Sequence, residues 1–210
     1  MTLNTPLHYQ IIKQDSYLRM PWKNGLGETL EIQRHDDEQG LRFRISQASV
    51  KDDGLFSDFS GLHRTLVLLS GNGMLLSHRN ASSENDETTE HQLTTPLDMA
   101  RFSGGDETHA RLINGVIEDL NIMVRDSDCR SSVQACFAPA FLSLAHEATL
   151  FTGFYANEDS IVAFQADETG ETNTLLIPSQ SLMLLSQHAI NLDAIQFISG
   201  CGILIEIADH

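Results

Sequence analysis

Apolar and polar residues alternate over short runs along most of the chain, which predicts β-strands. In residues 41–48, Leu41 and Phe43 point to one face, whereas Arg42, Arg44 and Ser46 point to the other. Similar runs continue to the C-terminus and are separated by Gly, Asn, Asp or Pro. No stretch has a sustained helical period. The pattern therefore predicts an all-β protein, either a sandwich or a barrel.

The first half is expected to contain strands at residues 9–12, 30–34, 41–48, 66–69, 74–78, 99–102, 108–113 and 116–125, and the second half at 149–155, 160–166, 174–177, 181–187, 195–199 and 203–207. The pair Asn72-Gly73 favours a tight turn, so residues 66–69 and 74–78 are predicted to form a hairpin. The polar residues 79–91 are predicted to be an exposed loop, and residues 126–132 a linker between two halves.

The stretch from residue 20 to residue 32 concentrates chemically distinctive side chains. It holds Trp22, the only tryptophan, beside Lys23 and Asn24. Gly25 and Gly27 allow a tight turn and the close approach of another group. Trp22 has two interpretations of similar weight, a core residue under the turn or a wall of a ligand pocket.

This stretch resembles the signature of the HutD/Ves family, bacterial proteins linked to histidine utilisation and to a stress-induced relative. The matching run is Trp-Lys-Asn-Gly-Leu-Gly-Glu-Thr at residues 22–29. Further matches follow in order at residues 43–46, 53–61, 64–71, 101–106 and 119–125. Several ordered matches are more specific than a single motif.

The resemblance implies a double cupin of the RmlC-like class, with two β-barrel halves in one chain. We expect an N-terminal half at residues 1–128, which carries the family motifs, and a C-terminal half at residues 129–210, packed together as one compact unit. Alternation alone does not distinguish a double cupin from another β-sandwich. The oligomeric state is left open between monomer and homodimer.

Charge and cysteine content exclude several classes of partner. The net charge of −16 opposes binding to nucleic acid or to anionic lipid. It does not exclude a small anion, because a few basic groups in a cavity can outweigh distant surface charge. The three cysteines form no Cys-x-x-Cys pair and are expected to be buried thiols. Without a leader-like N-terminus or a membrane-spanning apolar run, a cytoplasmic location is expected.

The nine histidines include no His-x-His pair of the kind that cupin metal sites use. Strand pairing could still bring His63, His78, His91 and His109 together, but their spacing does not require it. We expect no metal and no cofactor. No Gly-x-Ser-x-Gly elbow is present, and a base or Schiff-base role for Lys23 has less weight than a plain charge role.

The favoured site is a pocket for a small carboxylate in the first half. Its expected residues are Lys23 and Arg44 for charge, Asn24, Ser46 and Asn121 for hydrogen bonds, and Trp22, Phe102 and Met123 for apolar walls. Alternatively, Arg44, Ser46 and Asn121 form an internal polar network that only fixes strand pairing. Two roles are equally open for Arg64 and Arg125. They belong to the site, or they are structural and pair with Asp53, Asp106 or Asp119.

The function implied by the resemblance is non-enzymatic binding of a small acidic metabolite, such as formylglutamate, that limits or senses histidine utilisation. One alternative is a cupin enzyme, an isomerase, epimerase or metal-dependent oxygenase, with Lys23 or His63 as base. Another is a Ves-like stress-induced protein that contacts a partner through residues 79–91.

Overall fold

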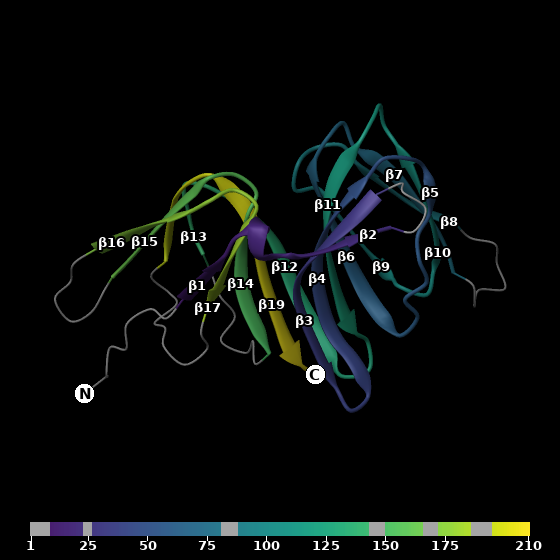
Figure 1. Ribbon diagram of the computed structural model, residues 1–210, viewed down its shortest axis with the longest axis horizontal. Coiled ribbons are helices and arrows are strands. Elements are labelled where there is room, and N and C mark those ends of the chain that lie inside the picture. Colours follow the sequence, from purple (N-terminus) through teal and green to yellow (C-terminus); the bar gives the residue numbers. More distant parts are fainter. Residues whose placement is uncertain (1–8, 23–26, 81–87, 143–149, 166–171, 186–194) are drawn as a thin grey trace. The chain divides into compact units, whose positions relative to one another are not determined.

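The computed structural model describes residues 9–22, 27–80, 88–142, 150–165, 172–185 and 195–210, and this part of the chain is all-β (Figure 1). Within these ranges the only helix is a short 3-10 turn at Gln14–Ser16. No helix there is long and apolar enough to cross a membrane. The predicted all-β class is confirmed. The chain forms two compact units, a first unit at Tyr17–Cys129 and a second unit that combines the N-terminal strand with Arg130–His210.

The first unit contains two antiparallel sheets. The larger sheet has the order β2-β3-β4-β11-β6-β9 and the smaller one the order β5-β10-β7-β8. The strands are β2 (Leu18–Pro21), β3 (Gly27–Asp37), β4 (Gly40–Val50), β5 (Gly54–Leu55), β6 (Leu62–Ser70), β7 (Met74–Arg79), β8 (Thr88–Leu93), β9 (Met99–Ser103), β10 (Glu107–Leu112) and β11 (Ile117–Arg125). Buried residues of both sheets, including Leu66, Leu76 and Ile117, form one apolar core.

Strand register places the polar residues of the larger sheet in rows. On β11, Met123 lies opposite Arg44 of β4 and, on its other side, opposite Arg64 of β6. Asn121 lies opposite Ser46 on β4. Because alternate residues of a strand point to one face, these side chains share one side of the sheet. This is the face that the sequence assigned to Arg44 and Ser46.

The predicted Asn-Gly hairpin is wrong. Although β6 and β7 are consecutive, β6 pairs with β11 and β9, whereas β7 pairs with β10 and β8. The connection is a corner between two sheets. Gly71 and Gly73 have φ angles of 97° and 106°, and a Cβ atom on Gly73 would lie 2.2 Å from the carbonyl oxygen of Leu93. The glycines therefore serve close backbone approach as well as the turn.

Two strands occur where the sequence predicted a loop and a linker. β8 begins inside the expected loop at residues 79–91, ends at Leu93 and pairs with β7. Only Leu93 is buried along it, so the apolar alternation that marks a strand is absent. β12 (Cys129–Phe137) begins inside the expected linker at residues 126–132, and only Cys129 and Val133 are buried along it.

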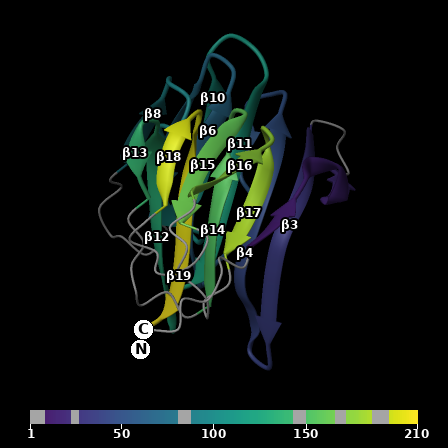
Figure 2. The ribbon, with the colours of Figure 1, turned by 90° about the vertical axis from the view of Figure 1, so that its left-hand side faces the viewer.

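The second unit also has two sheets, of order β1-β17-β14-β19-β12 and β13-β18-β15-β16 (Figure 2). Its other strands are β1 (Tyr9–Ile12), β13 (Ala140–Phe141), β14 (Phe151–Ala156), β15 (Ser160–Gln165), β16 (Thr172–Ile177), β17 (Ser181–Leu185), β18 (Gln196–Ser199) and β19 (Cys201–Asp209). The expected division of the chain at residue 128 differs from this arrangement at the N-terminus. Because β1 pairs with β17, the first strand belongs to the unit formed by the C-terminal half.

The cysteines only partly follow the expectation of buried thiols. All three are free, but only Cys129 is buried, whereas Cys136 and Cys201 are half-buried. Burial raises the pKa of each thiol above its ordinary value, which favours the unreactive protonated form.

Candidate functional site

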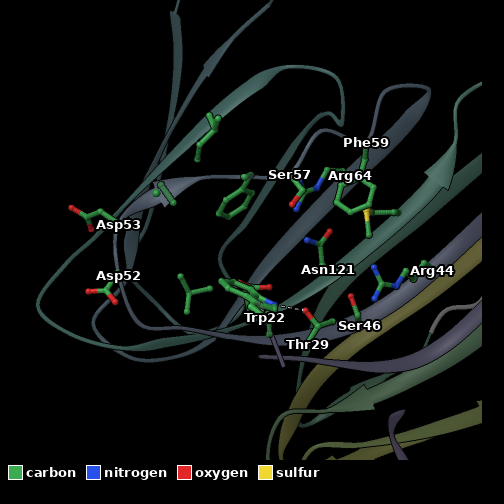
Figure 3. A pocket seen from close by; sticks show the side chains of 18 residues that line it. Trp22, Thr29, Arg44, Ser46, Asp52, Asp53, Ser57, Phe59, Arg64 and Asn121 are labelled. Atoms are coloured by element: carbon green, nitrogen blue, oxygen red, sulfur yellow. Dashed lines mark hydrogen bonds between the residues drawn. The ribbon is translucent and has the colours of Figure 1, made fainter. Parts of the chain in front are cut away.

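A cavity of about 380 Å³ lies in the first unit (Figure 3). One side is formed by neighbouring strands of the larger sheet, through side chains of β3, β4, β11 and β6. The segment from Asp52 to Phe59, which includes the short strand β5, forms another side. Strand pairing thus fixes the first wall, while the glycine-bounded segment of residues 52–61 supplies the second.

Five of the eight residues expected in the ligand site line this cavity. They are Trp22, Arg44, Ser46, Asn121 and Met123. Phe102 does not line it. It lies behind Arg64 in the apolar core, with its ring centroid 5.1 Å from the Arg64 guanidinium carbon. Lys23 and Asn24 lie outside the described residues.

Arg44 is already neutralised by a neighbour. Its Nε donates to Glu31 Oε2 at 2.7 Å, and the two side chains are only 15% and 14% exposed. The pair places a cation and an anion together at the cavity wall. Arg44 therefore contributes less free positive charge than the sequence alone indicated.

Arg64 lines the cavity and, unlike Arg44, forms no ion pair within the described residues. The residue is 4% exposed, and its guanidinium carbon lies 5.0, 5.4 and 5.1 Å from the ring centroids of Phe56, Phe59 and Phe102. Its Nε atom has no hydrogen-bond partner in the described chain. Burial lowers the pKa of Arg64 to about 10, so the guanidinium stays charged at neutral pH.

Two polar side chains of β11 also have unpaired buried atoms. Neither Asp119 Oδ1 nor Asn121 Oδ1 has a hydrogen-bond partner within the described ranges. Burial raises the pKa of Asp119 to about 7; the positive charge of Arg64 opposes this shift and the neighbouring Glu118 adds to it. The cavity therefore brings together an unpaired guanidinium and two unpaired acceptor atoms.

Arg64 and Asp119 were not among the residues expected in the site. The sequence placed Asp119 on the same face of its strand as Asn121, which was the available signal. The role of Arg64 was left open between the site and a structural arginine that would pair with an aspartate. The structure instead packs it on three aromatic rings, an environment that cation–π attraction stabilises.

Trp22 lies between the apolar core and the cavity. Its ring packs against the apolar core and also lines the cavity. The indole Nε1 donates to Thr29 Oγ1 at 2.9 Å, and the backbone N–H donates to the carbonyl oxygen of Gly27 at 3.0 Å. A Cβ on Gly27 would lie 2.8 Å from the Trp22 ring and 2.4 Å from Ser49 O. The absence of a side chain at position 27 therefore leaves room for the indole ring.

The cavity is electrically asymmetric. Asp52 and Asp53 lie toward one end, and Arg44, Ser46 and Asn121 lie toward the other (Figure 3). Asp53 Oδ1 accepts a hydrogen bond from the backbone N–H of Leu112 at 2.7 Å, which ties the segment to β10. A ligand that enters this space meets Asp52 and Asp53 at one end and Arg44 at the other.

No histidine lines the described part of the cavity. His78 is buried, with Nδ1 3.0 Å from Thr108 Oγ1 and its ring 4.3 Å from that of Phe102. Burial, followed by the neighbouring His91 and Arg64, lowers the pKa of His78 to about 4, so it is neutral at pH 7. Among the described residues, no three His, Cys, Asp or Glu side chains are grouped as metal ligands would be.

The fold and the cavity define a class of protein, a β-sheet protein of cupin-like fold with an internal pocket. A more remote solved structure, the oxalate decarboxylase of Lactobacillus farciminis, is similar in fold alone, with a TM-score of 0.57 at 8% identity over 94% of this chain and 85% of that chain. The HutD family model matches residues 14–197, and the chain belongs to the HutD family.

Individual relatives agree with this membership. The chain is 34% identical over 127 residues to an uncharacterized 21.2 kDa protein in the hutC 3′ region of Pseudomonas putida, covering 60% of this chain and 63% of that protein. It is 35% identical over 115 residues to the protein Ves of Citrobacter koseri, covering 54% and 56%. The matches thus span less than two thirds of these curated relatives.

A solved structure of HutD from Pseudomonas fluorescens SBW25, recorded in a formate condition, is similar over almost the whole chain. The TM-score is 0.70 at 25% identity, with 97% of this chain and 100% of that chain covered. The resemblance read from residues 22–29 and the later matches is therefore confirmed.

Proposed function

We propose that this chain binds a small carboxylate metabolite in the cavity of its first unit, and that it limits or senses histidine utilisation without catalysing a reaction. The observation that carries the proposal is Arg64, a buried guanidinium that faces the cavity without an ion pair in the described chain. The metabolic setting is supported by the HutD family match and by the relative in the hutC 3′ region.

A buried cation is costly unless another group compensates it. The three rings around Arg64 provide cation–π attraction, but they accept none of its N–H groups in the way that an oxygen does. A carboxylate is the natural complement, because its two oxygens match the paired N–H groups of a guanidinium. Binding would therefore offset the cost of burying the Arg64 charge.

The remaining lining fits a small organic anion better than a bare ion. Trp22 and Met123 supply apolar surface, while Ser46 and Asn121 supply hydrogen-bonding groups. Arg44 would act together with Glu31, as a paired charge that orients a ligand. Lys23 and Asn24 of the family motif remain candidates for the same site on the resemblance alone.

We also infer that each unit is one cupin half, which would make the chain a double cupin. Each unit has two antiparallel sheets with buried residues of both in one core. Two packed sheets in each unit are what a cupin half would have, and this organisation supports the inference.

The test is a thermal-shift titration of metal-stripped protein with formylglutamate, glutamate, formate, urocanate and histidine. A ligand that binds the folded state raises the melting temperature by mass action. We expect formylglutamate to raise it in the wild type and not in Arg64→Met. The matched control is Arg111→Met, which removes an exposed arginine of β10 in the same unit.

An equal shift in wild type and Arg64→Met would contradict the assignment of Arg64. Stabilisation by a divalent metal, with no shift from any of the five compounds, would contradict the proposed function. That result would favour a metal-dependent cupin enzyme.

A further inference from the structure

Asp119 is the most deeply buried ionisable group of the cavity wall. The residue is 2% exposed, it lines the cavity, and its Oδ1 has no hydrogen-bond partner among the described residues. Strand pairing does not need this side chain, since an apolar residue would satisfy the same position of β11. A buried, unpaired carboxyl group that faces a cavity is better explained by a ligand than by the fold.

The position of Asp119 relative to Arg64 restricts what that ligand carries. Asn121 follows Asp119 on the same face of β11, about 7 Å further along the strand. Arg64 acts on Asp119 electrostatically, although no ion pair joins them. Both residues line the same cavity, so a ligand whose carboxylate pairs with Arg64 lies along a wall that also presents Asp119.

A carboxylate ligand alone would leave this arrangement incomplete. Its negative charge would approach Asp119, which offers an acceptor oxygen and repels an anion when ionised. A donor next to the ligand's carboxylate, such as an ammonium or an amide N–H, would pair with Asp119 Oδ1. It would satisfy the buried acceptor and relieve the repulsion.

We propose that Asp119 is the specificity-determining residue of the cavity, and that it selects carboxylates carrying an adjacent N–H donor, amino or amido acids, over bare carboxylates. This inference rests on the proposed function, because it takes the carboxylate to be bound at Arg64. The inference adds a second contact to the carboxylate–Arg64 pair, namely a hydrogen bond from the ligand's N–H donor to Asp119.

The test uses ligands that share one five-carbon dicarboxylate skeleton. Glutarate carries no donor, L-glutamate carries an ammonium group, and N-formyl-L-glutamate carries an amide N–H. Dissociation constants are measured by calorimetry on the full chain. We expect the better of the two donor-bearing ligands to bind about tenfold or more tightly than glutarate, the scale of one hydrogen bond to a charged group.

Two substitutions at position 119 separate the acceptor from the charge. Asp119→Val removes both, and we expect the preference over glutarate to fall to within about twofold. Asp119→Asn keeps an acceptor oxygen without the charge, so N-formyl-L-glutamate keeps its advantage while L-glutamate loses about tenfold. Glu38→Gln is the matched control, since it removes an exposed carboxylate of the same unit that does not line the cavity, and it leaves all three affinities unchanged.

The outcomes distinguish this inference from the proposed function. If wild type binds glutarate as tightly as the donor-bearing ligands, the role of Asp119 is overturned and the carboxylate site stands. If folded wild type binds none of the three, both are overturned. If Asp119→Val still binds the donor-bearing ligands more tightly than glutarate, another residue accepts the hydrogen bond from the donor and the inference fails. Should Asp119→Val not fold, the ratio of the two donor-bearing ligands in Asp119→Asn decides.

Discussion

The first unit contains two arginine–aspartate regions that use the same residue types in opposite ways. The first is an ion cluster of Arg42, Arg125, Asp37 and Asp128. Arg125 donates to both aspartates, with Nη1 2.8 Å from Asp37 Oδ1 and Nε 2.8 Å from Asp128 Oδ1. Arg42 lies 3.5 Å from each of the same aspartates. In the cavity, by contrast, no ion pair joins Arg64 to Asp119.

The electrostatic consequences run in opposite directions. In the ion cluster, hydrogen bonds from Arg125 hold the pKa of Asp37 well below its usual range and lower that of Asp128 to about 2. In the cavity, burial raises the pKa of Asp119 to about 7. Arginines with satisfied partners stabilise the fold, whereas an unpaired arginine in a cavity adds little stability and remains available to a ligand.

The largest effect is expected from Arg64→Met. It should weaken carboxylate binding by about 100-fold, because the anion loses a buried charge partner. Stability should stay the same or rise, since methionine fills much of the space without the cost of a buried charge. Calorimetry and urea denaturation test the two parts separately. A large loss of stability with unchanged affinity would place Arg64 among the structural arginines.

Arg44→Met is the comparison within the cavity. Glu31 already balances Arg44, so the loss of affinity should be about tenfold or less. The variant leaves Glu31 without its partner, and stability should fall by roughly 2 kcal/mol. The ratio of binding loss to stability loss should therefore be much larger for Arg64 than for Arg44.

Arg125→Met should reverse this pattern, with lower stability and unchanged ligand affinity. Asp37 and Asp128 have depressed pKa values in the folded state, so their contribution to stability is complete above about pH 4 and is lost as the pH falls toward 2. The difference in melting temperature between wild type and variant should narrow as the pH falls from about 4 to 2, and part of it should remain at pH 2 because the pKa of Asp37 is lower still. A difference that does not narrow over this range would show that packing, and not the ion cluster, stabilises this corner.

Alternation predicted the fold where one face of a strand is buried and the other is not. β4 and β11 were found in this way, and most strands of the second half were too. The pattern failed for β8, where only Leu93 is buried, and at the corner between β6 and β7. An Asn-Gly turn looks the same in a hairpin and in a corner, because the partner strands that distinguish them lie far away in sequence.

The site, like the fold, was predictable only as far as strand alternation and the family motif determine it. The shared face of Arg44 and Ser46 followed from period two, and with the family motif it gave five residues of the cavity wall but neither Arg64 nor Asp119. Which arginine is paired could not be predicted. Glu31 reaches Arg44 across the β3–β4 pair, and the rings that hold Arg64 come from residues 56, 59 and 102. Charge pairing is a property of the assembled sheets.

A smaller effect is expected from Gly27→Ala. The new Cβ would meet Ser49 O at 2.4 Å and the Trp22 ring at 2.8 Å, so the indole or the strand must move. Overpacking of this kind costs about 1–3 kcal/mol. The matched control is Gly54→Ala, where a Cβ meets nothing within 4 Å and the strain is absent. Equal denaturation midpoints for the two variants would contradict the close packing of Trp22.

The smallest effect is expected from Trp22→Phe, which removes the hydrogen bond from Nε1 to Thr29 Oγ1 and keeps most of the ring. The loss should be about 1 kcal/mol of stability, and affinity should change by about threefold or less. Thr29→Val removes the other partner, so a double-mutant cycle should return a coupling energy of about 1 kcal/mol. If Trp22→Phe weakens ligand binding far more than Thr29→Val does, the indole N–H turns from Thr29 to the ligand. Trp22 would then join Arg64 as a group that binds the ligand directly.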